Sequence, residues 1–194
     1  MFHQHFTTRT LRSAVVAGLA ALAIPAPALA FDFTGTKSLI AVTADGQRKT
    51  LGAVQFVPAK AGQATFKVVL QTEVFTDHFL SMREFKCLAG AKEVSCYVPY
   101  PYPHPATVGP GRLVWLEHSL LFLYKSPAEF GARLTNGVYY EFREQGAALV
   151  GRPMAVDLNE ISAPPADASV PPYGPAQRQE MDASTRWVRE LVIE

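Results

Sequence analysis

Short extended runs separated by turn dipeptides recur along this chain, and they limit the folds that it can adopt. Asp45-Gly46 is among the strongest short hairpin signals, and Asn136-Gly137 and Gly146 mark later turns. The predicted strands are 37–44, 49–58, 64–75, 92–98, 138–143 and 148–158. Consecutive strands joined by short turns, without long helices between them, predict a mostly-β fold. We expect a single-domain antiparallel barrel or strongly curved sheet with one or two short helices.

Two segments fit more than one element. In 76–88, apolar residues fit either a helical or an alternating period, and we favour a strand because the pair Cys87 and Cys96 needs an extended approach on both sides. In 112–125, leucines recur every three to four residues, which favours a helix in the first half. Its end, 121–124, is typical of a strand.

The N-terminal region has the three parts of a secretory signal peptide. Arg9 and Arg12 precede an apolar run at 13–24, and Ala28-Leu29-Ala30 is a small-x-small cleavage site. The run is too short to span a bilayer, which needs about 20 residues. We therefore expect cleavage after Ala30 and a periplasmic or secreted protein of a Gram-negative bacterium, with no integral membrane segment after cleavage.

The charge balance bears on the kind of partner. Without Arg9 and Arg12, 16 of the 18 basic residues remain against 17 acidic residues, a formal charge of −1. A nearly neutral chain without a basic block argues against nucleic acid as a partner. The expected partner is a small apolar molecule or an envelope protein.

Cys87 and Cys96 are the only two cysteines in the chain. Export would place them in an oxidising compartment, and a turn centred on Gly90 lies between two short extended runs. The spacing favours a structural disulfide across a hairpin over a redox-active pair, because catalytic pairs favour the tighter Cys-x-x-Cys spacing.

The segment from Tyr97 to Pro105 is the strongest candidate for a binding surface. Four prolines alternate with other residues there, and they stiffen the backbone in extended conformations. Tyrosines on a stiff backbone provide contact area at small entropic cost. The predicted ligand- or partner-binding residues are Tyr97, Tyr100, Tyr102, His104 and Arg83. Alternatively, the rings pack on the sheet as a lid.

Arg83 and Glu84 place opposite charges in an apolar stretch, so one of them would point inward if the element is a strand. A buried arginine requires a carboxylate partner. The simpler interpretation is a cross-strand ion pair at a sheet edge.

The remaining polar residues predict no catalytic or metal site. The mature chain keeps His78, His104 and His118, and no two of them have a spacing that places metal ligands on one face. No Gly-x-Ser-x-Gly, phosphate-binding loop or dinucleotide motif is present, so no cofactor is expected. A hydrolase that uses scattered carboxylates, or Ser81 with His78, remains the alternative hypothesis.

The predicted organisation has four parts. A cleaved signal peptide at 1–30 precedes a β-rich domain at 31–160 and a proline-rich loop at 161–177. Residues 178–194 are expected to dock on the domain as a strand or a helix.

The string from Phe79 to Cys87, with Cys96 and residues 98–102, resembles a family of exported proteobacterial proteins of unassigned function. Residues 136–140 and 187–194 are also similar to it, so the resemblance covers most of the mature chain. It implies a periplasmic or secreted location and transfers no activity or catalytic residue. Members often have acidic residues in the leucine-rich segment, where this chain has Trp115 and His118.

These patterns predict a non-catalytic periplasmic binding or interaction protein. It would present the disulfide-braced Tyr/Pro segment to its partner, and an apolar ligand pocket is the second binding surface that this hypothesis allows. The alternatives are a cell-envelope hydrolase and a structural envelope component.

Overall fold

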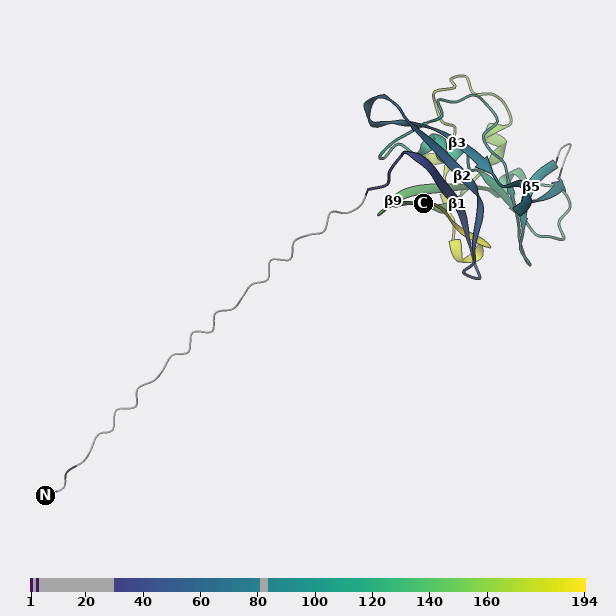
Figure 1. The fold of residues 1–194 in the computed structure, drawn as a ribbon. Coiled ribbons are helices and arrows are strands. Elements are labelled where there is room, and N and C mark those ends of the chain that lie inside the picture. The colour runs from purple at the N-terminus through teal and green to yellow at the C-terminus, as the bar shows by residue number, and fades with distance from the viewer. Residues whose placement is uncertain (2, 4–29, 81–83) are drawn as a thin grey trace.

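The computed structural model describes residues 1, 3, 30–80 and 84–194 (Figure 1). Most of the predicted signal peptide, together with Ser81 and Arg83, therefore lies outside the described residues. The roles predicted for these residues stay predictions.

Strands dominate the described chain. Their bounds are β1 Gly35–Thr43, β2 Arg48–Pro58, β3 Ala64–Leu70, β4 Thr76–Phe79, β5 Glu84–Ala89, β6 Val94–Tyr97, β7 Thr107–Val108, β8 Phe122–Lys125, β9 Gly137–Gln145, β10 Ala148–Val156, β11 Gln179–Glu180 and β12 Val188–Ile193. The α-helix in this part of the chain is α1, Val114–His118. Short 3-10 helices are η1 Lys60–Gly62, η2 Thr72–Val74, η3 Leu134–Asn136, η4 Leu158–Ile161, η5 Pro175–Gln177 and η6 Ala183–Thr185.

The strands of the described residues form one antiparallel sheet. Its order is β4-β5-β6-β8-β9-β10-β12-β1-β2-β3-β7, with β11 paired to β10. The sheet curves without closing, which confirms the mostly-β prediction in its curved-sheet form (Figure 1). The C-terminal strand β12 pairs with β1 on one side and β10 on the other, so it lies in the middle of the sheet.

A bulge interrupts the alternation in β2. The register with β1 shifts between Leu39 and Ile40, so Leu51 and Val54 are both fully buried although they are three residues apart. Gly52 lies at this shift with a φ of +151°, and a Cβ there would lie 2.1 Å from the backbone oxygen of Val69. The strand predicted at 49–58 is present, but the alternation of a regular strand fails at this point.

Residues 76–88 form two strands instead of the single strand that the pattern favoured. β4 and β5 pair with each other, with Thr76 opposite Cys87 and Asp77 opposite Lys86. Asp77 and Lys86 form an exposed ion pair at 2.6 Å. The chain therefore reverses between Phe79 and Glu84, and β4 becomes an edge of the sheet.

The disulfide predicted from the sequence joins β5 and β6. Cys87 and Cys96 are directly opposite each other in the ladder, and both are fully buried. The bond therefore closes the hairpin whose turn contains Gly90, as expected.

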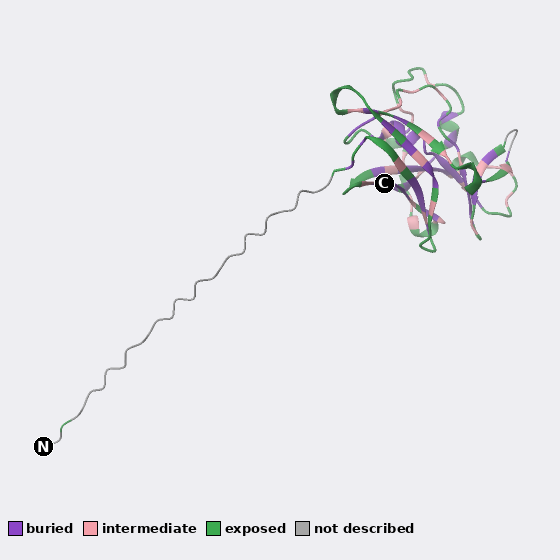
Figure 2. Cartoon of the chain, viewed as in Figure 1, coloured by how far each residue is buried: buried purple, intermediate pink, exposed green. Residues whose placement is uncertain are grey.

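Buried residues recur along the strands of the sheet, and they form one hydrophobic core (Figure 2). Tyr173 anchors the proline-rich loop to it, because this residue is fully buried and its hydroxyl donates to the carbonyl oxygen of Asp157 at 2.9 Å. In the part of the chain that the structure describes, every helix is too short or too polar to cross a membrane.

The short helix α1 fills a gap in the sheet. β8 pairs with β9 only at Val138 and Gly137, so the same edge of β9 has no strand partner farther along within the described residues. α1 lies against this edge and also contacts β7, which is at the far end of the strand order. The helix therefore bridges two strands that would otherwise leave an open seam, and a cleft remains beside it.

Candidate functional site

The structure turns the rings of the Tyr/Pro segment toward the protein. The hydroxyl of Tyr97, at the end of β6, donates to the carbonyl oxygen of Ser119 at 2.8 Å, and burial raises the pKa of Tyr97 to about 12. Tyr100 is only 7% exposed, and its N–H donates to the carbonyl oxygen of His118 at 3.0 Å. Tyr102 and His104 are half-buried. The prolines, not the rings of Tyr97 and Tyr100, therefore make up most of the outer surface of this segment.

These rings join an aromatic cluster around α1. The ring of His104 stacks on Trp115 with centroids 5.3 Å apart, and Tyr100 lies 6.0 Å from Trp115. His118 lies on the other side, stacked on Tyr173 at 5.4 Å. The hydroxyl of Tyr100 is buried without a hydrogen-bond partner in the described part of the chain. The cluster contacts Trp115 and His118 of α1 and so holds the helix in position.

His118 is a structural residue in this cluster. Its Nδ1 is 2.7 Å from the carbonyl oxygen of Val114, and its Nε2 accepts the N–H of Tyr173 at 3.2 Å. The carbonyl oxygen of Val114 can only accept, so Nδ1 carries the proton, whereas Nε2 accepts a hydrogen bond and carries none. The imidazole is therefore neutral. Burial lowers the pKa of His118 to about 4. At neutral pH the ring is therefore uncharged and both nitrogens are occupied.

Ser119 and His104 lie together, but their hydrogen bonds oppose nucleophile activation. Nδ1 of His104 accepts the N–H of Ala106 at 3.1 Å, so the neutral ring carries its proton on Nε2, which is 3.4 Å from the Ser119 hydroxyl. The hydroxyl itself donates to the carbonyl oxygen of Trp115 at 2.8 Å. A general base needs a free nitrogen lone pair facing the serine, and here that position carries the proton.

The remaining predicted polar residues lie elsewhere. His78 is half-buried in the edge strand β4, opposite Phe85, while Ser81 and Arg83 lie outside the described residues. Within 30–80 and 84–194, no group of three or more His, Cys, Asp or Glu side chains could hold a metal ion.

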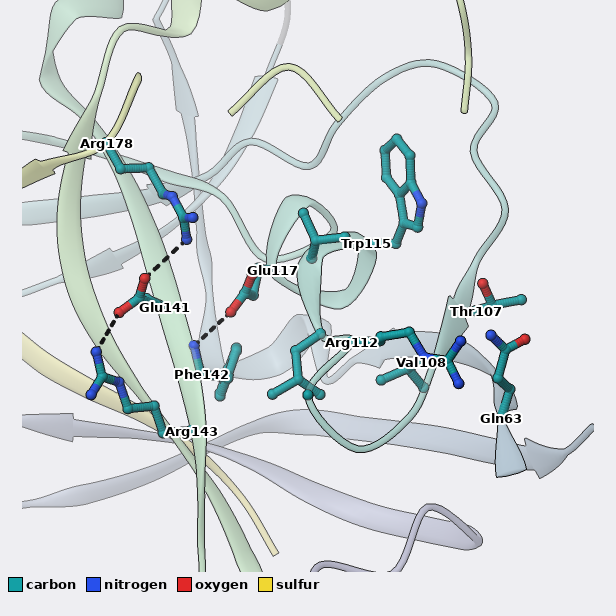
Figure 3. Close-up of a pocket in the computed structure, with 13 residues that line it drawn as sticks. Gln63, Thr107, Val108, Arg112, Trp115, Glu117, Glu141, Phe142, Arg143 and Arg178 are labelled. Atoms are coloured by element: carbon teal, nitrogen blue, oxygen red, sulfur yellow. Dashed lines mark hydrogen bonds and ion pairs between the residues drawn. The ribbon is translucent and has the colours of Figure 1, made fainter. Parts of the chain in front are cut away.

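The cleft beside α1 is the candidate functional site (Figure 3). It has a volume of about 540 Å³ and separates the β7 region from β9. Its lining residues are Gln63, Thr107, Val108, Gly111, Arg112, Leu113, Val114, Trp115, Glu117, Glu141, Phe142, Arg143 and Arg178. Apolar side chains and several charged side chains therefore line the same space.

Glu117 extends from α1 to the open edge of β9. Its Oε1 accepts the N–H of Phe142 at 2.8 Å, and its Oε2 accepts the hydroxyl of Tyr139. The carboxylate thus takes the place that a carbonyl of a neighbouring strand would occupy. Burial, which disfavours the charged form, raises the pKa of Glu117 above its usual range.

Glu141 links two ion pairs along one side of the cleft (Figure 3). One carboxylate oxygen lies 3.0 Å from Arg178, and the other lies 3.1 Å from Arg143. The guanidinium of Arg178 also lies over the ring of Tyr139, 5.0 Å from its centroid. Arg178 is mostly buried, with 14% of its side chain exposed, so this pair is the more firmly placed of the two.

Arg112 lines the cleft without an ion pair to any other described side chain, so its guanidinium is available to a ligand. The residue is exposed. Figure 3 shows its side chain pointing toward Gln63 and Thr107, on the side of the cleft opposite Glu141. Both of those residues carry hydrogen-bonding groups, so this side of the cleft can receive an anion.

Sequence reasoning missed most of this site. No motif or spacing in the sequence distinguishes Glu117, Glu141 or Arg178 from the other charged residues. The one available signal was a carboxylate in the leucine-rich stretch 112–125, since a buried acid requires partners.

The chain matches no protein family model, no curated protein and no solved structure. The resemblance to an exported proteobacterial family therefore stays a prediction, and function has to be argued from the cleft itself.

Proposed function

We propose that this protein is a non-catalytic binding protein of the periplasm or the extracellular medium, and that its ligand occupies the cleft beside α1. The observation that carries this proposal is the unpaired Arg112 at one side of a cleft whose other charged groups are already paired. The volume of about 540 Å³ lies within the usual range for small-molecule sites, roughly 300–1,000 Å³.

The lining favours a ligand with an apolar body and one anionic group. Leu113, Val114 and Trp115 supply apolar surface along α1, while Arg112 supplies the free positive charge. An arginine can hold a carboxylate through two parallel hydrogen bonds. The small apolar ligand expected from the sequence thus becomes an amphipathic acid in this proposal.

The Tyr97–Pro105 segment has a supporting role in this proposal. His104 and Tyr100 pack against Trp115, which lines the cleft from the other side. The disulfide hairpin leads directly into this segment, so it would stabilise the wall of the cleft.

Hydrolysis by the cleft carboxylates has less support. Each oxygen of Glu117 and of Glu141 already accepts a hydrogen bond or an ion pair from a protein group. A general acid or base needs an oxygen directed at the substrate or at an attacking water. The geometry therefore favours charges that shape a binding surface.

Native mass spectrometry of the mature protein purified from periplasm tests this function. We expect a retained acid, identified after denaturing extraction, and saturable binding of octanoate as a defined probe in calorimetry. Arg112→Gln should weaken octanoate binding about tenfold, because one charged hydrogen-bonding partner is lost. Arg152→Gln, an exposed arginine outside the cleft, is the matched control.

A clean apo mass without octanoate binding would overturn the small-ligand proposal and turn attention to an envelope protein. Equal octanoate binding by the Arg112→Gln and Arg152→Gln variants would refute the assignment to this cleft.

A further inference from the structure

A second cavity lies at the other end of β12 from the C-terminus. It has a volume of about 730 Å³ and shares no lining residue with the cleft beside α1. Three segments that are distant in sequence converge on it: the β1–β2 turn, the β5–β6 turn and residues 184–187. Its lining residues are Ala44, Asp45, Gln47, Lys49, Ala89, Gly90, Ala91, Lys92, Glu93, Ser184, Thr185, Arg186 and Trp187.

Hydrogen bonds join these segments around Trp187. The N–H of Ala44 donates to the carbonyl oxygen of Trp187 at 2.7 Å, and the N–H of Trp187 donates to Oε1 of Glu93 at 3.2 Å. The indole ring packs so closely on Gly90 that a Cβ there would lie 2.5 Å from it. The walls of this cavity are therefore already in place without a ligand.

Arg186 is held at the base of the cavity with little hydrogen bonding. Its guanidinium lies 3.7 Å from the centroid of the Tyr124 ring, and its Nη1 lies 3.2 Å from Oε2 of Glu93. Its Nε and Nη1 are buried, and neither has a hydrogen-bond acceptor in the described part of the chain. Among the residues that the structure describes, Glu93 is the carboxylate that forms an ion pair with Arg186.

Two further cations line the same cavity. The ammonium of Lys49 lies over the Trp187 ring, 5.6 Å from its centroid, and Lys92 is exposed on the hairpin turn. Neither lysine has an ion-pair partner within the described residues. Asp45, the other acid here, accepts a hydrogen bond from the hydroxyl of Thr43 in its own turn. The cavity lining thus has three cations and two acids. Arg186 is paired with Glu93. The hydrogen bond from Thr43 and, to a lesser extent, the nearby charge of Lys49 lower the pKa of the Asp45 carboxyl, so the lining keeps an excess of one positive charge.

We propose that this cavity binds a phosphate group, carried by a small soluble molecule or by a lipid headgroup. Lysine ammonium groups bind phosphate as point charges, and they can rotate to suit a tetrahedral anion. Lys49 and Lys92 lie on separate segments of the lining, so their ammonium groups can approach a phosphate from two sides. Arg186, whose Nε and Nη1 are buried, adds positive charge from within the wall. This site is independent of the ligand proposed for the cleft beside α1.

Calorimetry with inorganic phosphate at constant ionic strength tests the proposal. We expect saturable binding by the mature protein and a loss of affinity of about tenfold or more in the double variant Lys49→Gln with Lys92→Gln. The matched control is Lys60→Gln with Lys67→Gln, which removes two exposed lysines that do not line this cavity. Arg186 is left intact, because its loss would leave Glu93 buried without its partner.

Fluorescence gives a site-specific readout, because the chain has two tryptophans and Trp187 is the one in this cavity. In a Trp115→Phe background, phosphate should change the emission of Trp187 along the same binding curve. If that variant does not fold, the calorimetric comparison decides alone.

Sedimentation with vesicles separates the two sources of phosphate. Binding to phosphatidylglycerol vesicles but not to phosphatidylcholine vesicles, with loss in the Lys49/Lys92 variant only, would assign the site to a lipid headgroup. Binding of inorganic phosphate without vesicle binding would assign it to a soluble molecule. No response to either probe, or equal responses of both double variants, would overturn the proposal.

Discussion

The buried His118 should make this protein lose stability in mild acid. Its ring is fully buried, donates to Val114 and accepts from Tyr173, so both nitrogens are used by the neutral form. Protonation at Nε2 would break the bond from Tyr173 and place a charge in the aromatic cluster. Burial is the main cause of the lowered pKa, and the positive charges of Arg178 and His104 add to it.

The size of the effect follows from the difference in pKa between the folded and unfolded states. The pKa falls from 6.5 to about 4, so the folded state binds fewer protons between these values. This contribution to stability is fully present above pH 6.5 and is lost as the pH falls toward 4. At about 1.4 kcal/mol per pKa unit, the loss reaches roughly 2.5 kcal/mol by about pH 4.5.

Urea denaturation of the wild type and of His118→Gln across this range measures the effect. Glutamine keeps one donor and one acceptor but does not titrate, so its cost in packing is independent of pH. We expect the stability of the wild type relative to the variant to fall by about 2.5 kcal/mol between about pH 7.5 and about pH 4.5. Acidic residues that titrate in both proteins cancel in this difference.

A second measurement separates His118 from its surroundings. Residues 31–194 contain only His78, His104 and His118, so in a protein that consists of these residues the ring signals can be assigned by single substitutions and titrated by NMR. A His118 pKa near 6.5, or a stability difference that does not change with pH, would refute the assignment of a buried neutral ring.

Three further predictions rest on other elements of the fold. Burial raises the pKa of Glu117, so the wild type loses stability as this carboxyl ionises. We therefore expect Glu117→Gln to gain stability relative to the wild type as the pH rises from about 4.5 to neutral, measured by urea denaturation. The opposite trend would contradict burial as the cause of the raised pKa. Gly52→Ala should destabilise the fold by about 2 kcal/mol or more, because its Cβ would lie 2.1 Å from a backbone oxygen of β3. Gly174→Ala is the control: its Cβ would meet only a flexible side chain, so the melting temperature should change little. Replacing Cys87 and Cys96 with serine should cost roughly 2–3 kcal/mol, and an unchanged urea midpoint would show that the bond adds no stability.

Leucine spacing and turn residues predicted the elements whose structure depends mainly on neighbouring residues in the sequence. The leucine spacing in 112–125 indicated a helix followed by a strand, and the structure has α1 and then β8 there. The β4–β5 reversal was missed because Leu80 to Glu84 contains no Gly, Pro, Asn or Asp, and Ser81 alone is a weak turn signal between two extended runs. The β2 bulge was missed because a bulge depends on the partner strand, which a single run does not show.

The site depended on contacts that no local pattern contains. Glu117 shares its cleft with Arg178, and His118 bonds to Tyr173, although β8, β9 and β10 lie between the members of each pair in sequence. The Tyr/Pro segment was visible because its composition is unusual, but composition does not determine the direction of a ring. The direction was set by Trp115 and Ser119, which offered Tyr100 and Tyr97 an apolar surface and a carbonyl acceptor.

The position of the cleft follows from the unequal strand lengths in the sheet. β8 spans only Phe122–Lys125, whereas β9 spans Gly137–Gln145, so part of one edge of β9 extends beyond its neighbour. Backbone donors on that edge need acceptors, and Glu117 from α1 supplies one for Phe142. A helix contacts an edge less completely than a strand does, because only some of its side chains reach the ladder. The space that remains beside α1 is the cleft, so the residue that closes the sheet edge also lines the proposed binding site.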